Sequence, residues 1–248
     1  FEVADEKVQN FYTEKYGVVH PTKQGLKIPE MFDGAINKDV KAVWIIGEDI
    51  VQTDPNSAHV VQAMNSLELL VVQEIFMSET AKLATVVLPG TTFLEKNGTF
   101  TNTERRIQRV NQAVPPLPGT KTDGMIVTDM MQKLGFDQPT YDADQVLAEI
   151  ADIVPFFKGV TRERLGKMGL QWPVQEDGTD TQILHKETFK LGKGRLKNFD
   201  WKESAEIETN KKEYPLILTT SRVLQHYNAA TMTRRTSNIN IVSEDLLL

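Results

Sequence analysis

The chain has 248 residues, enough for one large domain or two smaller ones, and its 40% hydrophobic and 25% charged residues are ordinary for a globular protein. Its net charge of −6 argues against nucleic acid as a partner, because phosphate contacts need a basic face. It has no cysteine, which excludes disulfides and cysteine-ligated metals or iron–sulfur clusters within these residues.

The two ends of the chain predict that it is a fragment. It begins with Phe1 rather than methionine and stops after three leucines at Leu248. It has no signal-peptide pattern at its start and no apolar run near the roughly 20 residues that span a bilayer. We therefore expect no direct membrane insertion and a cytoplasmic location, with the periplasm as the alternative.

The first two predicted elements are helices. Residues 1–17 mix apolar and charged residues in an imperfect amphipathic pattern that Gly17 ends. Pro29 suits the first turn of a second, short helix. The apolar face of that second helix is formed by Met31, Phe32 and Ile36.

Three apolar runs then predict a parallel sheet of buried strands. The runs cover residues 42–46, 69–72 and 85–88. Asp54-Pro55 predicts the start of a helix after the first run, and Ser78 predicts the cap of a short helix through Ala84 after the second. The helix after the first run has apolar residues at every third position: Ala58, Val61 and Met64. Strands that alternate with helices make a parallel α/β sheet, whose ligands bind at the carboxyl ends of the strands.

The chain beyond the third run is more polar. Asn97-Gly98 predicts a tight reversal or a hairpin, and the prolines and glycine of residues 115–119 predict a linker. The arginines of residues 99–110 suit phosphate or carboxylate, and the alternative is a solvated edge strand.

Helices and a strand are predicted in the second half of the chain. Apolar spacing predicts helices over residues 122–134, 144–153 and 161–168. Residues 171–200 are rich in loop signals, and residues 214–220 have the pattern of a strand.

Polar residues at the ends of the first two strands form one candidate binding site. Gly47 would let the backbone approach a phosphate closely. The carboxylates of Glu48, Asp49 and Glu74 would accept hydrogen bonds from ribose hydroxyls or from the N–H edge of guanine. No G-x-G-x-x-G fingerprint follows any of these strands. The alternative is that Asp49 and Asp54 are turn and cap residues and that Glu74 lies on the surface.

A second candidate site follows the last predicted strand. Arg222, His226 and the neighbouring hydroxyl groups have the chemistry to surround a phosphorylated or pterin-like ligand. His226 is open to two interpretations, a general acid or base and a structural hydrogen-bonding residue, and a lone histidine is more often the latter.

Five stretches of the sequence, in order, resemble the molybdopterin oxidoreductase family, and most of all the large (alpha) subunit of its formate dehydrogenases. They include Gly-Glu-Asp at residues 47–49 and Trp172-Pro173. The five stretches cover residues 42–53, 72–81, 86–109, 169–173 and 218–235. Because they extend across nearly the whole chain, the resemblance is specific, and it indicates the C-terminal half of such a subunit.

The resemblance implies two molybdopterin guanine dinucleotides around one Mo or W, with a 4Fe-4S cluster in an N-terminal part outside this chain. It implies that residues 1–112 are part of a parallel-sheet αβα (Rossmann-like) domain, which holds one dinucleotide. A helical, loop-rich segment would follow over residues 113–210, and the start of a C-terminal β-barrel domain over residues 211–248.

The resemblance also assigns residues to the cofactor. At one dinucleotide it places Gly47, Glu48, Asp49, Gln52, Thr53, Gln73, Glu74, Phe76, Met77 and Thr80. Near the pterin it places Thr220, Arg222, His226, Met232 and Thr233. Many relatives have proline where this chain has Ile50, which changes the turn after Asp49.

The reaction implied is the two-electron oxidation of formate to CO₂ by the full-length protein, with an electron-transfer subunit or domain as partner. Without a cysteine, this chain contains neither the metal ligand nor a catalytic residue, and we expect it to be inactive alone. The alternatives are a nitrate reductase-like member of the family and a scaffold without cofactor, such as the large peripheral subunit of respiratory complex I. The polar candidate residues argue against the scaffold.

Overall fold

The computed structural model describes residues 2–203, 212–216 and 222–242. Residue contacts divide the chain into two units, Phe1–Pro89 and Gly90–Leu248. None of the helices in the described part of the chain combines the length and the apolar character that a bilayer crossing requires. The division into three domains at residues 112 and 210 stays a prediction.

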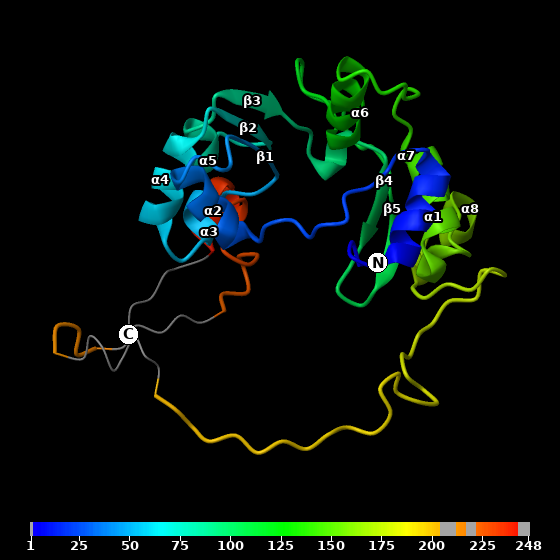
Figure 1. Cartoon of the computed structure of the whole chain (residues 1–248). Helices are drawn as coiled ribbons and strands as arrows, with labels where there is room; N and C mark the ends of the chain where they lie inside the picture. Colours follow the sequence, from blue (N-terminus) through cyan, green and yellow to red (C-terminus); the bar gives the residue numbers. More distant parts are fainter. Residues whose placement is uncertain (1, 204–211, 217–221, 243–248) are drawn as a thin grey trace. The chain divides into compact units, whose positions relative to one another are not determined.

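The first unit contains the predicted parallel sheet (Figure 1). Its strands are β1 (Ala42–Ile46), β2 (Leu69–Glu74) and β3 (Val86–Pro89), in the spatial order β1-β2-β3. Both neighbouring pairs are parallel, so that prediction is confirmed. Strand β2 continues two residues past its apolar run, because Gln73 and Glu74 pair with Leu88 and Pro89 of β3.

Three of the predicted helices of this unit are confirmed, and the unit contains one further short helix. Helix α1 (Glu6–Tyr16) ends at Gly17, and α2 (Ile28–Ile36) has Pro29 in its first turn. Helix α5 (Glu79–Lys82) begins after Ser78, whose side chain accepts a hydrogen bond from the Ala81 N–H. The single-turn helix α3 (Ile50–Thr53) was not predicted.

Helix α4 (Ser57–Ser66) begins later than predicted. Its N-cap is Asn56, which accepts a hydrogen bond from the His59 N–H, whereas Asp54 accepts one from the Asn56 N–H. Its buried face is also different from the predicted one, because a strict spacing of three drifts around a helix of 3.6 residues per turn. The buried residues are Val60, Ala63 and Met64.

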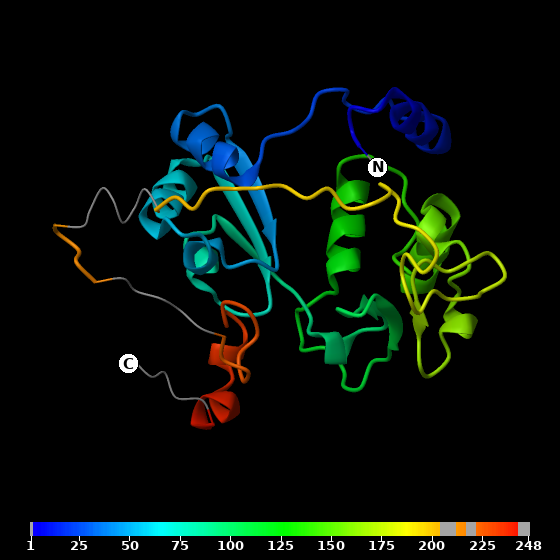
Figure 2. The ribbon, with the colours of Figure 1, turned by 90° about the horizontal axis from the view of Figure 1, so that it is seen from below.

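One face of the sheet carries the core of the first unit. Strand pairing places Val43 beside Leu70 and Ile45 beside Val72 on this face. These side chains share one buried cluster with residues of α2, α3, α4 and α5, which lie together beside the sheet in Figure 1, and Figure 2 shows the same unit from below. On the opposite face Ile46, Leu69 and Val86 are 40–48% exposed. Burial is thus confirmed for one face, and a second covering layer, as in an αβα domain, stays a prediction.

The second unit contains an antiparallel sheet. Strand β4 (Gly98–Thr101) pairs with β5 (Arg106–Val110), and β5 also pairs with β6 (Leu170–Gln171). The prediction of a reversal at Asn97-Gly98 is wrong, because Gly98 opens β4 opposite Val110. The turn lies at residues 102–105 instead, where the Asn102 side chain accepts hydrogen bonds from the backbone N–H groups of residues 104 and 106.

Three predicted helices of the second unit are confirmed: α6 (Asp123–Lys133), α7 (Ala143–Ile153) and the shorter α8 (Arg162–Leu165). Helix α6 is the upright green helix of Figure 2. Among the described residues of this unit, the remaining short elements are η1 (Phe93–Glu95), η2 (Pro155–Phe157), η3 (Thr233–Arg235) and α10 (Ser237–Ile241). The second unit has a buried core of its own, formed by Ile107 of β5, Leu147 of α7, Leu165 of α8, Val160 and Val174.

Arg105 and Arg106 have structural partners rather than open donors. The Arg105 guanidinium donates to the carbonyl oxygens of Trp172, Thr181 (3.0 Å) and Gln182 (3.1 Å), and it lies 5.7 Å from the centre of the Trp172 ring. Arg106 Nε donates to Glu104 Oε1 at 2.9 Å. These contacts attach the segment after β6 to the β4–β5 hairpin. In the order β4-β5-β6, β4 lies at an edge of the sheet and β5 lies in its centre, so the edge-strand alternative holds for residues 99–101 and is wrong for β5.

The start of a β-barrel domain stays a prediction. The expected strand covers residues 214–220, of which 217–220 lie outside the described residues. The described part, residues 214–216, is not in a strand.

The buried carboxylate of Glu95 holds the start of the second unit together. It accepts hydrogen bonds from the Thr92 N–H (2.8 Å), the Thr92 hydroxyl (2.9 Å) and the Leu117 N–H (2.9 Å). The pKa of Glu95 lies below its ordinary value of 4.5, mainly because of the two hydrogen bonds from Thr92. Burial raises this pKa, and the hydrogen bond from Leu117 lowers it further. Each of these donors favours the charged form of the carboxyl group.

We expect this network to make the second unit sensitive to acid. Because the pKa of Glu95 is lower in the folded state, its contribution to stability is present above about pH 4.5 and is lost as the pH falls through the folded-state pKa. Thermal unfolding measured from about pH 7 down to pH 3 should therefore depend less on pH in Glu95→Gln than in the wild type. Thr92→Val should reduce the dependence in part, and an identical pH dependence in Glu95→Gln and wild type would contradict the assignment.

Candidate functional site

The carboxyl ends of β1 and β2 bring two loops together, residues 47–53 and residues 73–80, which we call the strand-end rim. The Gly47 N–H donates to the Gln73 carbonyl oxygen at 2.9 Å and so extends the pairing of the two strands. Gly47 has a φ of 63°, and a Cβ placed on it would meet no atom within 4 Å. The backbone at Gly47 therefore faces open space that a ligand can approach.

The exposed polar groups of the rim lie on its first loop. The Thr53 hydroxyl donates to Glu48 Oε1 at 2.7 Å, and both residues are exposed, as is Gln52. On the second loop, Met77 is 58% exposed and Phe76 is half-buried. The rim thus combines a carboxylate, an amide and a hydroxyl with an exposed apolar side chain, which suits a ligand that has both polar groups and a flat ring.

Four other predicted residues are turned inward or used locally. Asp49, Gln73 and Thr80 are 3%, 1% and 0% exposed. Glu74 is half-buried, and its Oε1 accepts a hydrogen bond from the Ile75 N–H at 2.7 Å. The predicted residues of the rim therefore divide into an exposed set and a buried set.

Asp49 and Thr80 join the two loops of the rim. Asp49 Oδ1 accepts hydrogen bonds from the Thr80 hydroxyl (2.7 Å) and the Thr80 N–H (2.9 Å), and Oδ2 accepts a longer one from the Glu79 N–H (3.4 Å). The Thr80 hydroxyl oxygen in turn accepts a hydrogen bond from the Val51 N–H at 3.1 Å. Sequence reasoning missed the backbone donors of Val51 and Glu79, because no sequence signal pairs a loop with a helix about 30 residues away.

The pterin candidates lie in the second unit. His226 is 6% exposed, and its Nδ1 lies 3.0 Å from the Thr233 hydroxyl. Arg222, His226 and Arg234 line a pocket of about 530 Å³. Met232 is half exposed, and Thr220 lies outside the described residues. A buried histidine beside two arginines forms a site of positive character.

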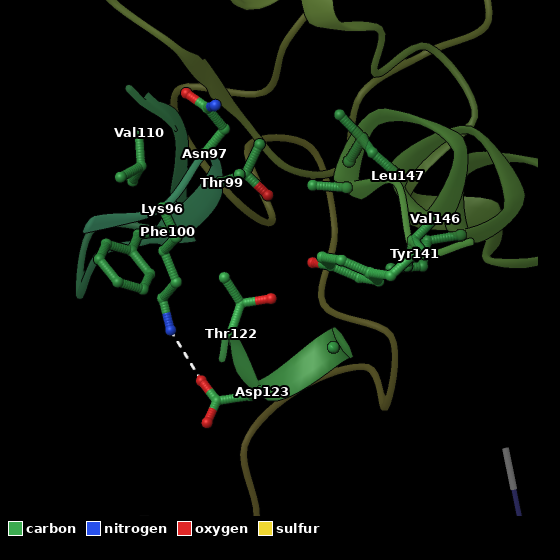
Figure 3. Close-up of a pocket in the computed structure, with 14 residues that line it drawn as sticks. Lys96, Asn97, Thr99, Phe100, Val110, Thr122, Asp123, Tyr141, Val146 and Leu147 are labelled. Atoms are coloured by element: carbon green, nitrogen blue, oxygen red, sulfur yellow. Dashed lines mark hydrogen bonds and ion pairs between the residues drawn. The ribbon is translucent and has the colours of Figure 1, made fainter. Parts of the chain in front are cut away.

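A further pocket of about 210 Å³ lies between β4 and the N-terminal ends of α6 and α7 (Figure 3). Lys96 Nζ and Asp123 Oδ2 form an ion pair of 2.7 Å beside it. The Tyr141 ring packs on Gly124, where an added Cβ would lie 2.1 Å from a ring carbon. Burial raises the pKa of Tyr141, and the charges of Asp123 and Asp142 add to the effect. Because Asp123 neutralises Lys96, the pocket offers no uncompensated cation for a phosphate.

The parallel sheet and its helices define an α/β protein, and comparison with known proteins specifies its family. The sequence model of the molybdopterin oxidoreductase family matches residues 9–133. The chain belongs to the molybdopterin oxidoreductase family.

Its relatives include formate dehydrogenases. The chain is 44% identical over 220 residues to the F420-dependent formate dehydrogenase subunit alpha of Methanocaldococcus jannaschii, a match that covers 87% of this chain and 32% of the relative. It is 37% identical over 250 residues to the probable oxidoreductase YjgC of Bacillus subtilis, covering 100% of this chain and 25% of the relative. The chain therefore spans a quarter to a third of the length of these relatives.

A solved structure supports the fold. The acetylene hydratase of Pelobacter acetylenicus superposes with a TM-score of 0.53 over 84% of this chain and 32% of its own, at 20% sequence identity. At this identity the similarity concerns the fold alone.

Proposed function

We propose that this chain is part of the alpha subunit of a formate dehydrogenase and that its strand-end rim holds the guanine dinucleotide end of a molybdopterin cofactor. The observation that carries the proposal is the 44% identity over 87% of the chain to a formate dehydrogenase subunit alpha. Relatives named as formate dehydrogenases also favour this function over a nitrate reductase or a scaffold without cofactor.

The rim fits such a group. A dinucleotide needs a close backbone approach for its phosphates and hydrogen-bond acceptors for its ribose and guanine. The open space at Gly47 provides the first, and the exposed carboxylate of Glu48 provides the second. The side chains of Gln52 and Thr53 add a donor and a hydroxyl group, and Phe76 and Met77 add apolar surface. The exposed residues would be held in place by the buried or half-buried residues of the rim, Asp49, Gln73, Glu74 and Thr80.

The second unit would bind the pterin portion. Arg222 and His226 would offer donors to its phosphate or to the polar edge of its ring, and Thr233 would orient the imidazole through their 3.0 Å contact. Met232 would add apolar contact, and Thr220 is assigned by resemblance. When bound, the cofactor supplies the metal that carries the two-electron oxidation of formate to CO₂. This chain supplies binding and orientation.

The full enzyme would need parts that this chain does not contain. The chain has no cysteine, so a cysteine ligand of Mo or W and the ligands of a 4Fe-4S cluster would come from elsewhere in the protein. Two dinucleotides, an electron-transfer partner and a cytoplasmic location belong to the same proposal.

The protein expressed at full length tests the proposal. We expect it to contain Mo or W, to release guanosine monophosphate after acid hydrolysis, and to reduce an artificial electron acceptor with formate. A preparation made with adequate molybdate and tungstate that holds neither metal nor any guanine nucleotide would overturn the proposed function. Metal and guanine without formate oxidation would limit it to cofactor binding.

A further inference from the structure

We infer that Asp49 and Thr80 are positioning residues, which hold the two loops of the strand-end rim in the shape that receives the dinucleotide without contacting it themselves. This inference rests on the proposed function, and it refines the role of two residues that resemblance alone places at the ligand. It begins with their burial. At 3% and 0% exposure, neither side chain offers a surface that a ligand outside the rim can reach.

The hydrogen bonds of Asp49 and Thr80 connect the two loops of the rim. Asp49 lies in the first loop, two residues after Gly47, and its carboxylate accepts hydrogen bonds from the N–H and hydroxyl of Thr80 at the start of α5. The Thr80 hydroxyl accepts from the Val51 N–H, back in the first loop. One hydroxyl therefore donates to and accepts from the same loop, which fixes its hydrogen position and the spacing of the two backbones.

The exposed rim residues are arranged around this bridge. Glu48 precedes Asp49, and Gln52 and Thr53 follow Val51 in the single turn of α3. Met77 lies three residues before Thr80 on the other loop. A shift of one loop against the other would therefore change the distance between Glu48 and Met77. Binding groups must be held to within about 0.5 Å for full effect, and this requires support from buried hydrogen bonds behind them.

Thr80→Val tests the inference, because valine retains the shape of threonine and removes its hydroxyl. Removing residues that orient the ligands of a metal typically lowers affinity by about 10- to 100-fold. By analogy we expect full-length Thr80→Val to retain about a tenth or less of the wild-type guanine content. Thr80→Ser, which restores the hydroxyl, should recover most of it. Retention of the wild-type guanine content by Thr80→Val would overturn the inference.

A control separates positioning from general loss of stability. Val60→Ala creates a cavity in the core of the same unit, at a position on α4 that belongs to neither loop and takes no part in the hydrogen bonds between them. We expect Val60→Ala to lower the thermal midpoint as Thr80→Val does, and to retain its guanine content. An equal loss of guanine in both variants would assign Thr80 a merely structural role and overturn the inference.

A second measurement does not depend on the folding of a variant. In the wild-type protein freed of cofactor, the Val51 amide hydrogen should exchange slowly, because Thr80 accepts it inside the rim. Exchange as fast as in an open loop would overturn the inference. Absence of guanine nucleotide from the wild-type protein would instead overturn the proposed function. Failure of the proposed function is therefore distinguishable from failure of the positioning role of Asp49 and Thr80.

Discussion

Replacement of Asp49 by alanine is expected to destabilise the first unit by about 3 kcal/mol and to empty the strand-end rim of cofactor. Removal of the carboxylate leaves the Thr80 N–H, the Thr80 hydroxyl and the Glu79 N–H without the acceptor that they use in the wild type. Each buried polar group left unsatisfied costs about 1–3 kcal/mol, and some of this loss is recovered where water enters the space. Urea unfolding followed by circular dichroism measures the first effect, and the Mo or W content of the full-length protein measures the second.

Asp54→Ala is the matched control for this variant. Asp54 is the same residue type five positions further along, and its side chain accepts one exposed hydrogen bond from the Asn56 N–H. We expect a loss of at most about 1 kcal/mol and an unchanged metal content, because an exposed donor returns to water. Equal effects of the two substitutions, or an unchanged metal content in Asp49→Ala, would contradict the role of Asp49 in the rim.

Gly169→Ala is expected to destabilise the second unit by about 3 kcal/mol or more, since it combines backbone strain with a clash. Gly169 has a φ of 74°, which a residue with a Cβ rarely adopts. A Cβ at this position would lie 2.3 Å from the Ile107 carbonyl oxygen, so β6 would have to move away from β5. Urea unfolding should show the loss, and amide exchange should show it first in β5 and β6.

Gly192→Ala separates the two causes. Gly192 has the same φ of 74°, and a Cβ there would meet no atom within 4 Å. Its substitution should therefore cost only the strain of the left-handed conformation, about 1 kcal/mol. If the two alanine variants unfold at the same urea concentration, the close approach of Gly169 to Ile107 does not contribute to stability.

Several elements of the fold were predictable because their causes lie within a few residues. The runs at residues 42–46, 69–72 and 85–88 became β1, β2 and β3 in the expected parallel arrangement. Ser78 caps the helix that follows it, and Gly17 ends α1 in the left-handed conformation that glycine tolerates.

The prediction errors arose where two neighbouring residues could each begin the same element, or where a residue distant in sequence determines the local conformation or the hydrogen-bond partner. Asn97-Gly98 has the pattern of a turn, yet Gly98 pairs with Val110 in the sheet and the Asn97 side chain accepts a hydrogen bond from the Gln112 N–H. Asp54-Pro55 resembles a helix start, but Asn56 is the residue that caps α4. Arg105 has the chemistry of an anion ligand, and its carbonyl partners lie 67 to 77 residues away in the chain.

The candidate site shows the same division. The sequence by itself determined which residues gather at the carboxyl ends of the strands, because in a parallel sheet all these ends lie on one edge. It also determined the family, through the order and identity of its motifs. The tertiary structure alone decided which of those residues are exposed and which are buried. Asp49 and Glu48 are adjacent in sequence. The carboxylate of Asp49 is buried against Thr80 of α5, whereas the Glu48 side chain is exposed. The physical reason is that the partner of a polar side chain depends on which segments the fold brings within hydrogen-bond distance.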